Sequence, residues 1–109
     1  LWYHFTGLPF VFALWILRRE AIEKFPLEVS ALAGQLQASR DYAFDHLPDM
    51  AARLSARTGF SAMHLEEYWR GMSYDLTEGH IEGLRLYFVL CHKHGLLEKE
   101  PDIHFFAAR

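Results

Sequence analysis

The longest apolar run in the chain lies near its N-terminus. The run Phe10-Val11-Phe12-Ala13-Leu14-Trp15-Ile16-Leu17 contains no polar side chain, and Arg18-Arg19 follows it. A run of this kind, preceded by turn residues and rich in aromatic and branched aliphatic residues, is typical of a strand buried on both faces. Such a strand needs neighbours on both sides, and the rest of the chain offers almost none. Since the chain also begins at Leu1, we expect a fragment whose sheet partners lie upstream.

Beyond this run the apolar positions repeat with helical spacing. A first long helix is predicted from Pro26 to Leu47, because one stripe recurs at steps of three, four and seven residues: Val29, Leu32, Leu36, Ala43 and Leu47. Pro26 suits the first turn of a helix. Pro48 is expected to interrupt the helix. A short helix over residues 49–57 follows, and Gly59 is expected to end it in the left-handed conformation.

Two more helices are predicted in the second half of the chain. Ser61 is a suitable N-cap for the first of them, with Leu65, Tyr68, Trp69 and Met72 on its inward face. Thr77 is a suitable N-cap for the second, which is expected to end near His94 with Gly95 as its capping glycine. Residues 84–91 are apolar on nearly every side, which predicts a helix buried all round.

The expected fold class is therefore α/β but mostly helical. We expect a single fragment over residues 1–109, with a turn and buried strand in residues 1–19 and a helical part in residues 20–109. Residues 103–106, after Pro101, are compatible with a short C-terminal strand. The single cysteine, Cys91, cannot form an internal disulfide and is expected to be a small buried hydrophobic residue.

Charge and length exclude two classes of partner. The net charge is −3 and the basic residues form no stripe, so nucleic-acid binding is not expected. The apolar run near the N-terminus is about half of the roughly 20 residues that span a bilayer. Its positive charges follow it rather than precede it, unlike those of a secretory signal. We therefore expect no membrane association.

The usual signatures of catalytic and metal sites are not found. The closest pair among the seven histidines, His92 and His94, would lie on nearly opposite faces of a helix, and one cysteine cannot complete a thiolate site. There is no Gly-x-Ser-x-Gly nucleophile motif and no glycine-rich phosphate loop. We predict no metal and no organic cofactor, and the residues identify no general acid or base.

The turn Thr6-Gly7-Leu8-Pro9 is the remaining candidate site. Gly7 permits a positive φ and a close approach of other groups, and Pro9 fixes the entry into the apolar run. Backbone N–H groups and the Thr6 hydroxyl at such a turn are able to bind a carboxylate. A plain junction between a loop and a strand explains the same residues, and the residues alone leave both interpretations open.

A wider motif around this turn resembles a known family. The pattern Trp2-x-x-x-Thr6-Gly7-Leu8-Pro9-Phe10-Val11-Phe12-Ala13-x-Trp15 is similar to a stretch of the chorismate dehydratases, the first enzymes of the futalosine route to menaquinone. The later order also fits: Tyr42, Thr58-Gly59, Tyr74-Asp75-Leu76, Glu82-Gly83-Leu84 and Gly95-Leu96-Leu97. The resemblance covers nearly the whole chain and would place it in the C-terminal part of such an enzyme.

The resemblance implies a fold, a reaction and a location. The fold would be the two-lobed type II periplasmic-binding-protein fold, with a ligand cleft between lobes and the N-terminal remainder of the same protein as partner. The reaction would be the loss of water from chorismate to give 3-[(1-carboxyvinyl)oxy]benzoate in the cytoplasm. Thr6 and the Gly7 backbone would contact the substrate, and Leu8 and Pro9 would shape the wall of the cleft. The base is not identified, and a carboxylate of the substrate is one candidate.

Three other functions remain open. The related dihydroxynaphthoate synthase of the same pathway shares the fold, although its expected motif differs at the Thr-Gly-Leu-Pro segment. A non-catalytic type II solute-binding protein would share the fold without the reaction. A self-contained helical interaction module would instead fold cooperatively on its own.

Overall fold

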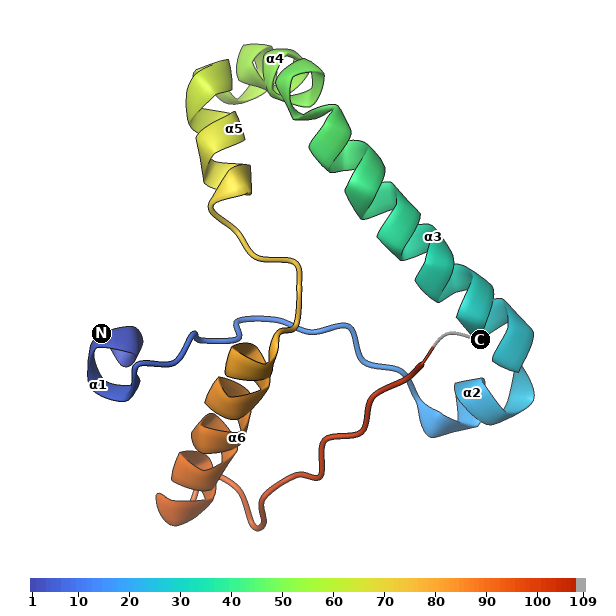
Figure 1. The fold of residues 1–109 in the computed structure, drawn as a ribbon, viewed down its shortest axis with the longest axis vertical. Coiled ribbons are helices and arrows are strands. Elements are labelled where there is room, and N and C mark those ends of the chain that lie inside the picture. The colour runs from blue at the N-terminus through green and yellow to red at the C-terminus, as the bar shows by residue number, and fades with distance from the viewer. Residues whose placement is uncertain (108–109) are drawn as a thin grey trace. The chain divides into compact units, whose positions relative to one another are not determined.

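A computed structural model describes residues 1–107 of the chain and shows a helical protein (Figure 1). The helices in this range are α1 (Trp2–Thr6), α2 (Arg19–Lys24), α3 (Pro26–Asp45), α4 (Leu47–Thr58), α5 (Ala62–Arg70) and α6 (Glu78–Lys93). No β-strand is present among these residues.

The prediction of a buried strand over residues 10–17 is wrong. Residues 9–18 form neither helix nor strand, and several side chains of the run are open to solvent, with Phe12 at 92 %, Trp15 at 86 % and Ile16 at 85 % exposure. A strand exists only where a neighbouring strand completes its hydrogen-bond ladder, and the described residues supply no such neighbour. The apolar pattern correctly indicated a segment that is not helical. It could not show whether a neighbouring strand was available to pair with that segment.

The C-terminal strand and the α/β fold class are also not found. Residues 103–106 lie in an irregular segment after α6. Without a sheet among residues 1–107, the described chain does not have the predicted architecture of a type II periplasmic-binding-protein fold. The observed class is all-α.

The chain divides into two compact units, and each is described by itself. The first unit combines Leu1–Ile16 with Tyr74–Phe105 and contains α1 and α6. The second contains Leu17–Ser73 together with the last described residues from Phe106, and holds α2 to α5. The first unit is therefore built from two separate stretches of sequence.

The helix boundaries of the second unit follow from prolines and glycines. Pro26 occupies the start of α3, as predicted. Pro48 does not interrupt a helix but lies in the first turn of α4, where its missing N–H has no helical partner to lose. The chain instead changes direction at His46, between α3 and α4. Gly59 ends α4 at φ 78°, confirming the expected left-handed residue.

The second unit has a small core. Its buried apolar residues are Val29, Leu47, Ala51 and Leu65. Only part of the predicted inward stripe of α3 is buried, since Leu32 is 50 % exposed. Tyr68 on α5, expected to face the core, is 61 % exposed. Ser61 caps α5 as predicted, with its side chain accepting a hydrogen bond from the His64 N–H at 3.1 Å.

The first unit is organised by α6. Thr77 is its N-cap, as predicted, and its side chain accepts a hydrogen bond from the His80 N–H while the His80 ring accepts one from the Thr77 N–H. At the other end Gly95 has φ 71°, and the Leu96 N–H donates to the Cys91 carbonyl at 2.8 Å. This is the hydrogen-bond pattern of a glycine-terminated helix.

The burial of α6 is one-sided rather than complete. Gly83, Leu84 and Cys91 are buried, whereas Tyr87 is 40 % exposed and Val89 is 39 % exposed. The prediction of a helix buried all round is therefore wrong for the described chain. The prediction for Cys91, a buried free thiol, is confirmed.

Candidate functional site

The turn at Thr6-Gly7-Leu8-Pro9 begins at the end of α1. Helix α1 was not predicted, and it ends where Gly7 adopts φ 68° and ψ 6°. The Gly7 N–H donates to the Tyr3 carbonyl at 2.8 Å, which closes the last turn of the helix. The positive φ expected of Gly7 is thus present, and it serves as the C-terminal cap of a short helix.

The Thr6 hydroxyl holds the turn together from within. It donates to the Trp2 carbonyl at 2.9 Å, with the Leu8 carbonyl as a more distant acceptor at 3.4 Å. The same oxygen accepts a hydrogen bond from the Leu8 N–H at 3.1 Å. Thr6 therefore links the end of α1 to the residues that follow it.

These bonds determine which donors the turn has left for a ligand. The N–H groups of Gly7 and Leu8 are both engaged internally, and Pro9 has none. Beyond the turn, the first backbone N–H groups without a hydrogen bond in residues 1–107 are those of Phe10 and Val11. Sequence reasoning missed these two groups, because it could not show which N–H groups the turn itself consumes.

The turn rests on the N-terminal half of α6. Gly79 and Gly83 are four residues apart on this helix, so they lie on one face. A Cβ placed on Gly79 would lie 3.7 Å from Cδ of Pro9, and one placed on Gly83 would lie 3.6 Å from Cβ of Leu8. The two glycines thus form the surface against which Leu8 and Pro9 pack.

An aromatic cluster continues this contact. Trp2 meets Phe10 edge-to-face, with ring centroids 5.4 Å apart, and meets Tyr87 of α6 at 6.2 Å. Phe10 also packs edge-to-face against Tyr87 at 5.4 Å and against Phe12 at 4.9 Å. The Trp2 Nε1 atom is buried and has no hydrogen-bond partner. The cluster holds both sides of the turn against α6 through ring contacts.

Tyr87 carries the one clear electrostatic perturbation near this site. Its phenol interacts with the Cys91 thiol one helical turn away, and this hydrogen bond raises the pKa of Tyr87 above its ordinary value of 10.0. The negative charge that Cys91 acquires on ionisation raises the pKa of Tyr87 further. The Tyr87 phenol is therefore held in its neutral form.

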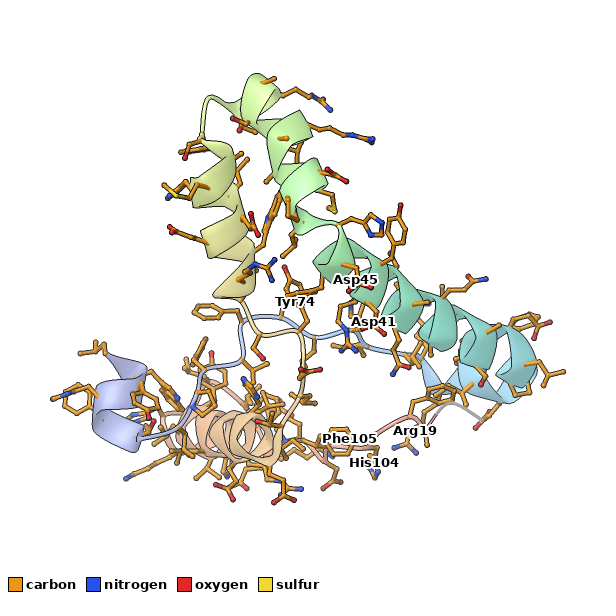
Figure 2. All side chains as sticks on the ribbon, turned by 45° about the horizontal axis from the view of Figure 1, so that its top comes forward. Arg19, Asp41, Asp45, Tyr74, His104 and Phe105 are labelled. Atoms are coloured by element: carbon orange, nitrogen blue, oxygen red, sulfur yellow. The ribbon has the colours of Figure 1, made fainter. Side chains whose placement is uncertain are left out.

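Outside the turn, acidic side chains of the described residues form ordinary helix-surface pairs rather than a metal site. Figure 2 shows Asp41 and Asp45 on α3, one helical turn apart, and Asp41 is paired with Arg40 at 3.0 Å. Within residues 1–107, no three His, Cys, Asp or Glu side chains are placed to hold a metal ion. In the same range, no helix combines the length and apolar character needed to cross a bilayer.

Comparison with known proteins gives the chain a family. Its architecture is that of a helical protein with a capped turn packed on a glycine-bearing helix, and no solved structure matches it. Residues 1–93 match the family described as menaquinone biosynthesis, a range that includes both the turn and α6. The chain therefore belongs to the menaquinone biosynthesis family, and this confirms the family that the sequence motif indicated.

Proposed function

We propose that the complete protein containing this chain is a carbon–oxygen lyase that dehydrates chorismate to 3-[(1-carboxyvinyl)oxy]benzoate. The observation that carries the proposal is the family match over residues 1–93, because it contains the Thr6-Gly7-Leu8-Pro9 motif that resembles chorismate dehydratases. Membership of a biosynthetic family implies an enzyme. The choice of reaction rests on the motif, and so does the expected cytoplasmic location.

The proposed reaction is a simple elimination. A proton leaves the ring carbon that bears the enolpyruvyl ether, hydroxide leaves the neighbouring carbon, and the two combine as water. Because the ring becomes aromatic, the products are strongly favoured, and the enzyme has to bind the substrate, accept a proton and assist the departure of hydroxide. No metal or organic cofactor is needed to balance this step.

The turn would contribute to substrate binding rather than to proton transfer. Leu8 and Pro9 are half-buried and apolar, which suits the wall of a site for a ring. The Thr6 hydroxyl still has acceptor capacity, but its proton is engaged with the Trp2 carbonyl. We therefore assign Thr6 to shaping the turn, and the Gly7 backbone to the same task. Donors to the two substrate carboxylates would come from other groups, including those of the N-terminal remainder.

Incubation of the complete protein with chorismate tests the proposal. The expected product is aromatic and lighter than chorismate by one water, as measured by liquid chromatography with mass detection. Chorismate deuterated at the ether-bearing ring carbon should lose its label. Unchanged chorismate, or formation of 4-hydroxybenzoate with loss of pyruvate, would contradict the proposed reaction. Protein inactivated by heat controls for the spontaneous decay of chorismate.

A further inference from the structure

Gly83 lies in the interior of α6, where glycine is the least favourable residue apart from proline. A packing reason for it is found in the structure. A Cβ at this position would overlap the carbonyl oxygen of Pro9, well inside van der Waals contact. Because that oxygen belongs to the backbone, it cannot rotate away as the end of a flexible side chain would. Gly83 is therefore required for the Pro9 carbonyl to lie where it does.

Other glycines of the chain make this requirement specific. A Cβ on Gly79, one turn earlier, would meet only ordinary contacts with the Pro9 ring, at 3.7 and 3.8 Å. A Cβ on Gly34 of α3 would meet nothing within 4 Å. The same substitution to alanine thus has three different steric consequences at three helical positions.

The position of the Pro9 carbonyl also determines the direction of the next hydrogen-bond donor, the Phe10 N–H. The Pro9–Phe10 peptide bond is trans, as are all the peptide bonds described. In a planar trans peptide the C=O and the following N–H point in opposite directions. With the Pro9 carbonyl directed at Gly83, the Phe10 N–H is directed away from that contact. This N–H has no hydrogen-bond partner in residues 1–107.

We propose that Gly83 is a positioning residue that orients the Phe10 N–H to bind a carboxylate of the substrate. The inference rests on the proposed function for the identity of the ligand, a carboxylate-bearing ring. It adds a donor that the Thr-Gly-Leu-Pro motif itself does not contain. Gly83 lies on α6 and does not touch the substrate. It acts by setting the plane of the Pro9–Phe10 peptide, whose N–H contacts the substrate.

Steady-state kinetics of the complete protein with chorismate test the inference. The bond to a substrate carboxylate forms on binding and persists in the transition state, so its loss raises KM more than it lowers kcat. For Gly83→Ala we expect KM to rise about tenfold, with kcat unchanged within about threefold. Gly34→Ala, where a Cβ meets nothing within 4 Å, is the control for a glycine-to-alanine change in a helix and should leave both constants unchanged. A variant that merely folded poorly would lower kcat through a smaller active fraction, with KM unaltered.

A second measurement does not depend on turnover. The Phe10 amide resonance of ¹⁵N-labelled protein should shift when chorismate is added, and this shift should be lost in Gly83→Ala but kept in Gly34→Ala. If Gly83→Ala does not fold, Gly79→Leu carries the test, because its larger side chain presses on the Pro9 ring and should also raise KM.

The outcomes separate the two proposals. Failure of the wild-type protein to convert chorismate, with no response of the Phe10 amide, overturns the proposed function. Normal conversion with an unchanged KM in folded Gly83→Ala, or with a silent Phe10 amide in the wild-type protein, overturns the role of Gly83 and leaves the lyase proposal intact.

Discussion

The Leu8 N–H donates to the hydroxyl oxygen of Thr6 across 3.1 Å, so the side chain that precedes the turn binds the backbone that follows it. The same hydroxyl donates to the Trp2 carbonyl at 2.9 Å. One oxygen thereby joins the first turn of the chain to the segment that packs on α6. This explains why a threonine stands before Gly7, independently of any ligand.

Removing this hydroxyl should affect both stability and turnover. Thr6→Val keeps the shape of the side chain but leaves the Leu8 N–H without its acceptor, and we expect a loss of about 1 kcal/mol in the free energy of unfolding. With the proposed reaction we expect kcat/KM for chorismate to fall by about tenfold, since a loosened turn misplaces the site. Thr6→Ser keeps the hydroxyl and serves as the control. Unchanged kinetics in Thr6→Val would remove the turn from the site.

The N-terminus of α6 offers a test of its cap. Thr77→Ala removes the oxygen that accepts the His80 N–H, and loss of such a cap costs about 1 kcal/mol. Urea unfolding of the complete protein should show this decrease, whereas Thr77→Ser should lose much less. Equal stability of Thr77→Ala and the wild type would show that the cap contributes nothing. Because α6 supports the turn, the alanine variant should also lose affinity for the substrate.

The raised pKa of Tyr87 predicts that the free energy of unfolding decreases at alkaline pH. Its phenol holds its proton more tightly in the folded protein than in the unfolded chain, since Cys91 raises the pKa of Tyr87. The stability that this provides is complete below pH 10 and is lost as the pH rises through the raised pKa. Ultraviolet titration of tyrosinate should therefore show one late-ionising tyrosine.

Substitution of Cys91 separates the two causes of this shift. In Cys91→Ala both the hydrogen bond and the thiolate charge are removed, so the pKa of Tyr87 should fall back toward 10.0. In Cys91→Ser a hydroxyl can still bond to the phenol but adds no charge, and an intermediate pKa is expected. A titration curve that is identical in all three proteins would contradict the assigned interaction.

The proposed elimination should not depend on a metal. Treatment of the complete protein with EDTA, followed by removal of the chelator, is expected to leave kcat and KM for chorismate unchanged. Loss of activity that added zinc restores would overturn this prediction. Addition of zinc to untreated protein is the matching control for inhibition by the metal itself.

Local signals in the sequence predicted the ends of the helices well. Ser61, Thr77, Gly59 and Gly95 act through bonds to backbone groups only a few residues away, so their roles can be inferred without the rest of the fold. The short helix α1 gave a weaker signal: Gly7 was expected to adopt a positive φ, but five residues before it carry too little periodicity to indicate a helix.

The failures concern contacts between distant parts of the chain. The apolar run over residues 10–17 was expected in a sheet, but a sheet depends on partners that periodicity does not reveal. The role of Gly83 was missed for the same reason, since only the structure brings Pro9, more than seventy residues earlier, onto its Cα. A glycine in the middle of a predicted helix was the one available signal.

The discontinuous first unit has a consequence for synthesis in the cell. Leu1–Ile16 leaves the ribosome long before Tyr74–Phe105 is translated. Its aromatic side chains therefore have no α6 to pack against until α2 to α5 have been synthesised. During that interval Trp2 and Phe10 lack the Tyr87 ring that they contact in the folded unit, so their apolar surfaces stay exposed and prone to aggregation. A nascent chain of this topology is a natural client for chaperones that hold hydrophobic segments, and slowing translation should lengthen its exposure.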